Sequence, residues 1–235
     1  MNTSESAQRR IAAWFDSTYL RKGSRYLRPL QGYMVYPELL GASPSDALLD
    51  VACGPGMLLL AASGKTEQLF GCDLSSVAVG LARSRVPTAR VSVANAEALP
   101  YESSRFDLVT CLGSLERMLD RPRALAEMLR VGTPRARYCF LVRNSNTVGW
   151  KYLARSSARR PSRGHADADT LDNWTRLFES AGFLVRQVLP DQYPLLRRRS
   201  WRRFVFGPVD YRRPVASSAP VDRANEFVFL LGKQG

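Results

Sequence analysis

The sequence has a single histidine, His165, and its four cysteines never occur in a Cys-x-x-Cys spacing. Structural metal sites and redox motifs usually need clusters of these residues. We therefore expect no metal ion, and we interpret the cysteines as buried free thiols. They are Cys53, Cys72, Cys111 and Cys139.

Long apolar runs are also missing. No stretch approaches the ~20 apolar residues that a membrane-spanning helix needs, and Met1 to Arg10 lacks the apolar core of a signal peptide. The chain has 235 residues, of which 45% are hydrophobic and 23% charged, which is the composition of an ordinary soluble domain. These observations predict a single cytoplasmic domain over residues 1–235.

Lysine is nearly absent as well, so arginine carries most of the formal net charge of +13. Such an excess favours anionic partners, such as nucleic acid, an acidic membrane surface or an acidic substrate. Arginine-rich codon usage produces the same excess without any such partner. We favour codon usage, and nucleic acid and anionic membrane stay as alternatives to a small-molecule partner.

The most informative stretch is 48–56, Leu-Leu-Asp-Val-Ala-Cys-Gly-Pro-Gly. It starts as a short apolar run of the kind found in strands that are buried on both faces. Glycines then turn the chain, and residues 57–62 continue as an apolar helix. A strand, a glycine turn and a helix N-terminus together form the nucleotide crevice of doubly wound α/β folds.

Details of the turn select the kind of nucleotide. Leu59 stands where a dinucleotide fingerprint needs a third glycine or alanine, and the carboxylate of Asp50 would repel a pyrophosphate. A ligand with a cationic end fits better. The segment resembles motif I of class I S-adenosylmethionine (SAM)-dependent methyltransferases, Asp-x-Gly-x-Gly-x-Gly. Ala52 replaces the first glycine, and we expect little cost because alanine is also small.

Two later stretches extend the resemblance. The second predicted strand, 68–74, ends near Asp73, about 20 residues after Gly54, the offset at which an acidic residue binds ribose hydroxyls. Residues 95–101, Asn-Ala-Glu-Ala-Leu-Pro-Tyr, are similar to the loop Gly-Asp-Ala-Glu-x-Leu-Pro-Phe of small-molecule methyltransferases. There the acidic residue accepts a hydrogen bond from the adenine amino group. Asn95 replaces it here, and its amide oxygen can still accept.

The resemblance also implies a lid. Helices before the first strand commonly cover the cofactor pocket in these methyltransferases, so residues 1–46 are predicted to form an N-terminal helical lid. Tyr19 and Arg28 are its candidates for the methionine carboxylate, which a guanidinium can bind with two hydrogen bonds. The predicted SAM-binding residues are Tyr19, Arg28, Asp50, Ala52, Cys53, Gly54, Gly56, Asp73, Leu74, Asn95, Ala96, Glu97 and Leu112.

Relatives often carry a histidine after the fourth strand, sometimes as a base near the substrate. Arg117 stands at that place within 113–120, so we expect catalysis without a dedicated histidine. A nitrogen acceptor would need only alignment with the methyl group. An oxygen acceptor would need a general base, for which the candidates are His165, Glu116 and Tyr101.

The predicted fold class is α/β, a doubly wound seven-stranded Rossmann-like methyltransferase sheet whose last strand returns antiparallel between its neighbours. Residues 47–143 are predicted to form the cofactor-binding half and residues 144–235 the acceptor-side half. A basic insert, 191–224, precedes the last strand and contains the run Arg-Arg-Arg-Ser-Trp-Arg-Arg. The predicted strands lie near residues 48–52, 68–74, 90–94, 106–112, 138–142, 183–189 and 226–231.

The functional prediction follows from the resemblance. SAM is the predicted cofactor, and its methyl group would pass by in-line displacement to an oxygen or nitrogen atom of a small molecule, such as a natural-product intermediate. One alternative is a methyltransferase that acts on RNA, or on a membrane lipid or quinone, through the basic insert. Against RNA, the chain lacks the Asn/Asp-Pro-Pro-aromatic motif of base-amino methylation after the fourth strand. A second alternative is a non-catalytic protein with the cofactor fold.

Overall fold

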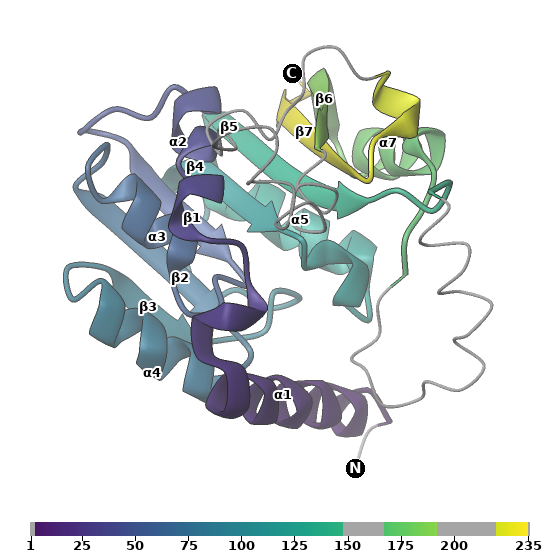
Figure 1. Ribbon diagram of the computed structural model, residues 1–235. Coiled ribbons are helices and arrows are strands. Elements are labelled where there is room, and N and C mark those ends of the chain that lie inside the picture. The colour runs from purple at the N-terminus through teal and green to yellow at the C-terminus, as the bar shows by residue number, and fades with distance from the viewer. Residues whose placement is uncertain (1–2, 148–166, 192–219, 235) are drawn as a thin grey trace, which may run out of the picture.

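Seven strands form one mixed sheet through the middle of the molecule (Figure 1). The computed structural model describes residues 3–147, 167–191 and 220–234. The strand order is β3-β2-β1-β4-β5-β7-β6. The strands are β1 (Ala47–Val51), β2 (Gln68–Asp73), β3 (Arg90–Val93), β4 (Phe106–Leu112), β5 (Gly132–Arg143), β6 (Phe183–Asp191) and β7 (Glu226–Lys233).

Strand direction changes near one edge of the sheet. The first five strands run parallel, whereas β7 pairs antiparallel with both β5 and β6. The chain passes from β1 to β2 on one side and later to β4 on the other. β1 and β4 therefore flank the topological switch point, where open α/β sheets bind their ligands. The predicted doubly wound seven-stranded sheet is confirmed, including its antiparallel last strand.

Helices cover both faces of this sheet. On one face, α2 (Val35–Leu39), α3 (Met57–Ala62) and α4 (Ser76–Arg85) bury apolar side chains. On the other face, α5 (Arg121–Val131) and α7 (Leu171–Ser180) bury theirs. Burial on both faces is the reason why β1 is a nearly continuous apolar run.

The N-terminal part of the chain begins with α1 (Thr3–Lys22) and continues through the short 3-10 helices η1 (Gly23–Tyr26) and η2 (Leu30–Gly32). Figure 1 shows α1, in dark purple, along the edge of the molecule beside α4. Oδ1 of Asp16 accepts hydrogen bonds from Ser75 Oγ at 2.5 Å and from the Val77 N–H at 3.2 Å. α1 is thereby attached to the turn that follows β2.

β5 begins at Gly132, well before the predicted start at residue 138. The register between β4 and β5 shifts between Phe106 and Leu108, which accommodates the extra residues of β5. Pro134 lies in this irregular part and is exposed, so its missing N–H does not disturb the regular ladder. The predicted start was wrong because apolar alternation marks only the regular part of the strand.

The predicted basic insert, 191–224, overlaps its neighbouring elements. Asp191 is the last residue of β6, and a 3-10 helix, η6 (Val221–Arg223), precedes β7. Residues 192–219, with the arginine-rich run, lie outside the described residues, as does His165. Among the described residues, no helix has the length and apolarity needed to cross a membrane. The division into a cofactor half and an acceptor half stays a prediction.

Candidate functional site

Asp50 of β1 is a buried carboxyl group at the switch point. Its Oδ1 accepts a hydrogen bond of 2.7 Å from Thr110 Oγ1 of β4. Burial raises the pKa of Asp50 to about 7, against the effect of the Thr110 hydrogen bond, and the nearby Asp73 adds to the rise. A cation beside Asp50 would favour the ionised form. The position therefore suits a cationic ligand.

The turn after β1 is left-handed at Ala52 (φ 59°), at Gly54 (φ 52°) and at Gly56 (φ 76°). Glycine adopts this conformation freely, whereas it costs other residues roughly 1–2 kcal/mol. Ala52 thus has the backbone conformation of the motif glycine that it replaces. The expectation that alanine costs little here is wrong, because its size fits but its backbone is strained.

Both glycines of the turn lie where a side chain would collide. A Cβ on Gly56 would lie 3.0 Å from Ala82 Cβ and 3.2 Å from Ala82 Cα, so this glycine lets α4 pack against the turn. A Cβ on Gly54 would lie 2.9 Å from the hydroxyl oxygen of Tyr19. Tyr19 is buried. The structure therefore places this predicted cofactor residue directly against the turn.

Asp73, at the end of β2, holds two turns together. Its Oδ2 accepts a hydrogen bond from the Gly54 N–H at 2.8 Å, and its Oδ1 accepts one from the Ser75 N–H at 2.9 Å. Burial raises the pKa of Asp73 to about 6, although both hydrogen bonds favour the ionised form. Each carboxylate oxygen has a second lone pair. Binding of ribose hydroxyls by Asp73 stays a prediction that this geometry allows.

The predicted adenine loop is a tight turn after β3. Asn95 Oδ1 accepts a hydrogen bond from the Glu97 N–H at 3.1 Å. Glu97 is buried: Oε1 accepts from the N–H groups of Leu119 and Asp120, and Oε2 accepts from Gln8 Nε2 at 3.0 Å. Glu97 therefore joins this loop to α1 and to the segment before α5. Contact of Asn95 or Glu97 with the cofactor stays a prediction.

Arg28 has partners other than the methionine carboxylate assigned to it from the sequence. Nη1 donates to Asp191 Oδ2 at 2.5 Å and to Tyr36 Oη at 3.0 Å, while Nη2 pairs with Glu226. The Arg28 side chain is 10% exposed and that of Asp191 is fully buried. A guanidinium held by two carboxylates is poorly placed to bind a third. We correct the assignment: Arg28 fastens the N-terminal segment to the ends of β6 and β7.

Tyr101 is half-buried and packs against the core of the sheet. Its hydroxyl donates to the Gly71 carbonyl oxygen at 3.2 Å and lies 3.1 Å from Ser92 Oγ. Its ring packs edge-on against Phe70 and Phe106. Burial raises the pKa of Tyr101 to about 12, so its phenolate is scarce near neutral pH. This environment does not support the prediction that Tyr101 is a general base.

The other predicted cofactor residues lie at strand ends or in the turns that follow them. Cys53 is buried in the turn after β1, and burial raises the pKa of its thiol well above the usual value, so it stays neutral. Leu74 follows β2, Ala96 lies in the adenine loop and Leu112 ends β4, and all of them are half-buried. Among the described residues, no group of three histidine, cysteine, aspartate or glutamate side chains is placed to hold a metal ion.

Glu116 lies in the 3-10 helix η3 (Leu115–Arg117), just after β4, and is 1% exposed. Its Oε1 accepts a hydrogen bond from the Arg143 N–H at 2.9 Å. Its Oε2 is buried and has no hydrogen-bond partner in the part of the chain that the structure describes. Burial raises the pKa of Glu116, although the charge of Arg143 opposes the rise. A raised pKa and an open lone pair are properties that a general base needs.

A row of charges at the sheet edge was missed by the sequence analysis. The strand register pairs Arg143 of β5 with Glu226 of β7, and Glu226 with Asp191 of β6. The sequence signal is weak: each residue is a single charge beside an apolar strand. Their meeting depends on the order of strands that are distant in the chain.

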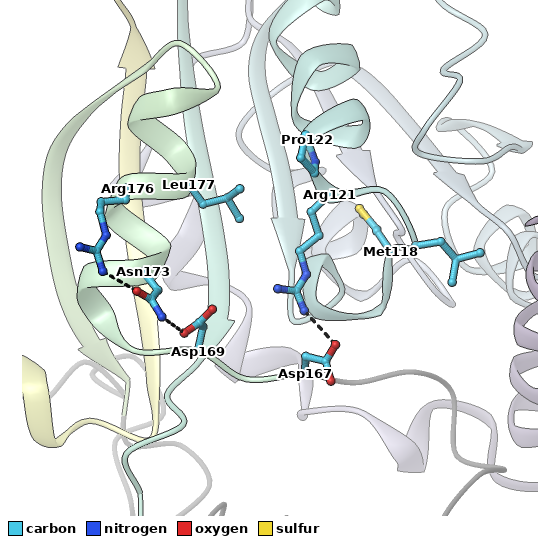
Figure 2. Close-up of a pocket in the computed structure, with 9 residues that line it drawn as sticks. Met118, Arg121, Pro122, Asp167, Asp169, Asn173, Arg176 and Leu177 are labelled. Atoms are coloured by element: carbon cyan, nitrogen blue, oxygen red, sulfur yellow. Dashed lines mark hydrogen bonds and ion pairs between the residues drawn. The ribbon is translucent and has the colours of Figure 1, made fainter.

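A pocket of about 470 Å³ lies between the start of α5 and α7, and Figure 2 shows residues that line it. Its polar groups pair with one another: Arg121 with Asp167 at 3.4 Å, and Asn173 with Asp169 at 2.5 Å and with Arg176 at 2.6 Å. The other lining residues are Met118, Leu119, Pro122 and Leu177. None of the predicted cofactor residues lines this pocket. We interpret its polar contacts as structural.

Comparison with known proteins adds independent evidence. Residues 49–140 match the family described as "Methyltransferase domain". The ubiquinone/menaquinone biosynthesis C-methyltransferase UbiE of Chromobacterium violaceum is 31% identical over 199 residues, covering 80% of this chain and 78% of the relative. A 2-phytyl-1,4-naphtoquinone methyltransferase of Trichormus variabilis is 36% identical over 110 residues, or 43% of this chain. The chain spans about half of that relative's length, 48%.

The fold comparison agrees with the sequence comparison. The geranyl diphosphate C-methyltransferase of Streptomyces coelicolor, crystallised with Mg²⁺, geranyl-S-thiolodiphosphate and S-adenosyl-L-homocysteine, has a TM-score of 0.63 at 16% identity. The similarity covers 86% of this chain and 75% of that one. Fold and site thus define a Rossmann-like α/β protein with buried carboxyl groups and a left-handed glycine turn at its switch point. With the UbiE relative, they show that this chain belongs to the class I SAM-dependent methyltransferases.

Proposed function

We propose that the chain transfers the methyl group of SAM to a ring carbon of a small quinone-type acceptor in its reduced, quinol form. The observation that carries this proposal is the 31% identity to the UbiE C-methyltransferase over 80% of the chain. An alignment of that length extends beyond the predicted cofactor half into the acceptor half, 144–235. The naphthoquinone methyltransferase supports the same acceptor class.

The described residues fit SAM. The buried carboxyl groups of Asp50 and Asp73 flank the left-handed turn, and SAM carries a sulfonium and an ammonium group. Asp73 would bind the ribose and Asn95 the adenine edge. The glycines of the turn would let the amino-acid part of SAM approach the backbone, and Tyr19 would cover that turn.

The chemistry depends mainly on alignment. SAM supplies an electrophilic methyl group on a sulfonium leaving group, so the protein must orient the nucleophile in line with the C–S bond and exclude water. α1 can exclude water because Gln8 ties it to the adenine loop and Asp16 ties it to the turn after β2. A quinol ring carbon becomes a better nucleophile when a ring hydroxyl loses its proton, which favours a base beside the acceptor.

The test is an assay with SAM labelled in its methyl group and 2-prenyl-1,4-naphthoquinone that has been reduced to the quinol. NMR of the product distinguishes a ring methyl group from a methoxy group. We expect a labelled ring methyl group. Gly56→Val is the cofactor-site control, because its side chain would collide with Ala82 and should abolish transfer. Transfer to oxygen, or none to any quinol by a protein that binds SAM, would overturn the proposal.

The other acceptors allowed by the sequence, RNA or a membrane lipid, depend on the basic insert. Most of this insert, 192–219, lies outside the described residues, so these partners stay predictions from charge alone. The alternative of a protein without catalytic activity is tested by the same assay.

A further inference from the structure

Five charged side chains form a continuous chain across one edge of the sheet. Arg143 Nε lies 3.9 Å from Glu116 Oε1 and 3.7 Å from Glu226 Oε1. Glu226 pairs in turn with Arg28, and Arg28 with Asp191 at 2.5 Å. This charge chain contains three carboxyl groups (Glu116, Asp191 and Glu226) and two guanidinium groups (Arg28 and Arg143). If all of them are ionised, these five side chains sum to one negative charge, and the positive charge of Arg117 also acts on Glu116.

Glu116 lies at the end of this charge chain that has the longest ion-pair distance, 3.9 Å. Both Asp191 and Glu226 contact the Arg28 guanidinium directly. The partner of Glu116 in this charge chain is Arg143, whose Nε lies 3.9 Å from Oε1. The side chain of Glu116 is 1% exposed, and its Oε2 has no hydrogen-bond partner within the described residues. A buried oxygen without a hydrogen-bond partner destabilises the folded protein, so such exceptions call for an explanation.

The position of Glu116 in the fold offers an explanation for this oxygen. η3 follows the carboxyl end of β4, and β4 borders the switch point through the hydrogen bond from Thr110 to Asp50. Ligands of α/β sheets bind outside these carboxyl ends. The neighbouring Arg117 lies over the ring of Phe15 of α1, at 5.3 Å from its centroid, so the N-terminal helix extends over η3. Glu116 thus lies just after the carboxyl end of β4 and contacts the end of β5 through Arg143.

We propose that Oε2 of Glu116 accepts the proton of a hydroxyl group on the methyl acceptor. This role rests on the proposed function, because it assumes a quinol acceptor. The O–H bond breaks, its proton binds Oε2, and its electron pair moves into the ring. The ring carbon forms a bond to the methyl group while the C–S bond breaks and leaves its electron pair on sulfur. The ring carbon then loses its own proton to water, and Glu116 returns its proton to the ring oxygen, which restores the hydroxyl group.

The rest of the charge chain would keep this base in place. Arg143 holds Oε1 through its backbone N–H, which leaves Oε2 for the acceptor. Glu226 and Arg28 fix the side chain of Arg143 from the other side. Charges from four separate parts of the chain therefore orient one carboxylate oxygen, which is the kind of support that a catalytic group requires.

The test compares Glu116→Gln with Glu102→Gln, an exposed carboxylate outside the site, in the quinol assay. Glu116→Gln keeps the shape of the side chain and should lower kcat about 10²–10⁴-fold. Its SAM affinity, measured by calorimetry, should stay within about twofold of the wild type. Glu102→Gln should retain the wild-type kcat. A Glu116→Gln enzyme with kcat within about threefold of the wild type overturns the role of Glu116 and leaves the proposed function intact.

A second measurement uses the wild type and does not depend on folding of a variant. Its kcat should rise with pH as Glu116 ionises, and this rise should be weaker with a halogenated naphthoquinol, whose more acidic hydroxyl depends less on a base. The same pH profile for both acceptors overturns the proposal. A wild type that binds SAM but methylates no quinol overturns the proposed function, and the role of Glu116 with it.

Discussion

The backbone N–H of Gly54 donates a hydrogen bond of 2.8 Å to Oδ2 of Asp73, which joins the turn after β1 to the end of β2. The other oxygen of Asp73 accepts from Ser75 at 2.9 Å and fixes the next turn. One carboxylate therefore fixes both turns at the place where it is predicted to bind a ligand. Its replacement should affect both stability and cofactor binding.

Asp73→Ala should lower SAM affinity about ten- to hundredfold, because a charge-assisted pair with the ribose is worth about 1.5–3 kcal/mol. It should also lower the melting temperature, since the N–H groups of Gly54 and Ser75 lose their acceptor. Calorimetry and thermal unfolding measure the two effects. Glu67→Ala, which removes an exposed carboxylate just before β2, should change neither. Unchanged SAM affinity in Asp73→Ala would contradict the ribose assignment.

Ala52→Gly should stabilise the protein by about 1 kcal/mol, because glycine relieves the left-handed strain at φ 59°. For a chain of this length that corresponds to a rise in melting temperature of roughly 2–4 °C. Ala61→Gly, within the helical backbone of α3, is the matched control and should lower stability by about 0.5–1 kcal/mol. A lower melting temperature for Ala52→Gly would show that packing of the Ala52 methyl group stabilises the protein by more than the left-handed backbone destabilises it.

The sequence predicted what lies in contiguous stretches. The strand, turn and helix at 47–62 and the strand end at Asp73 have local patterns, and the structure places them together. The cost of Ala52 could not be predicted, because the small size of alanine indicates that it fits the turn but carries no information on the left-handed backbone there. Arg28 was misassigned because its partners, Asp191 and Glu226, lie 163 and 198 positions away. A pairing of that kind follows from strand order, for which a single sequence carries no local signal.

The pKa of Asp50 predicts how stability changes with pH. Its pKa is raised from 3.8 to about 7 in the folded protein, so the neutral form is favoured by folding. The resulting contribution of Asp50 to the free energy of unfolding is fully present below pH 4 and is lost as pH rises through about 7. Asp50→Asn should therefore lose less stability than the wild type between pH 4 and pH 7.5 in denaturant titrations without SAM.

Asp46 provides a control of opposite sign. Hydrogen bonds from Ser43 and Arg137 lower the pKa of Asp46, so its contribution is present above pH 4 and is lost as pH falls. Asp46→Asn should destabilise the protein at pH 7 and have less effect at pH 3. Equal pH slopes for Asp50→Asn and the wild type would show that Asp50 is ionised in the folded protein.

Arg28→Ala tests the corrected role of Arg28. Removing the guanidinium takes away the cation that lies 2.5 Å from the fully buried carboxylate of Asp191, and such a loss typically costs about 3–5 kcal/mol. The melting temperature should fall accordingly. Arg25→Ala, an exposed arginine in the same segment, should have little effect. If Arg28→Ala kept its melting temperature and lost only SAM affinity, Arg28 would bind the methionine carboxylate after all.

His165→Ala separates the two remaining candidates for a general base. His165 lies outside the described residues, and Arg117 stands where relatives often have a histidine. If Glu116 takes the proton of the acceptor, kcat of His165→Ala should fall by less than about tenfold, because alignment with a sulfonium leaving group supplies much of the remaining rate. The measurement is kcat across pH, with SAM affinity measured separately. A loss of about a thousandfold at unchanged SAM affinity, together with a normal rate for Glu116→Gln, would assign the base to His165, since general-base catalysis contributes about 10²–10⁴-fold wherever it operates.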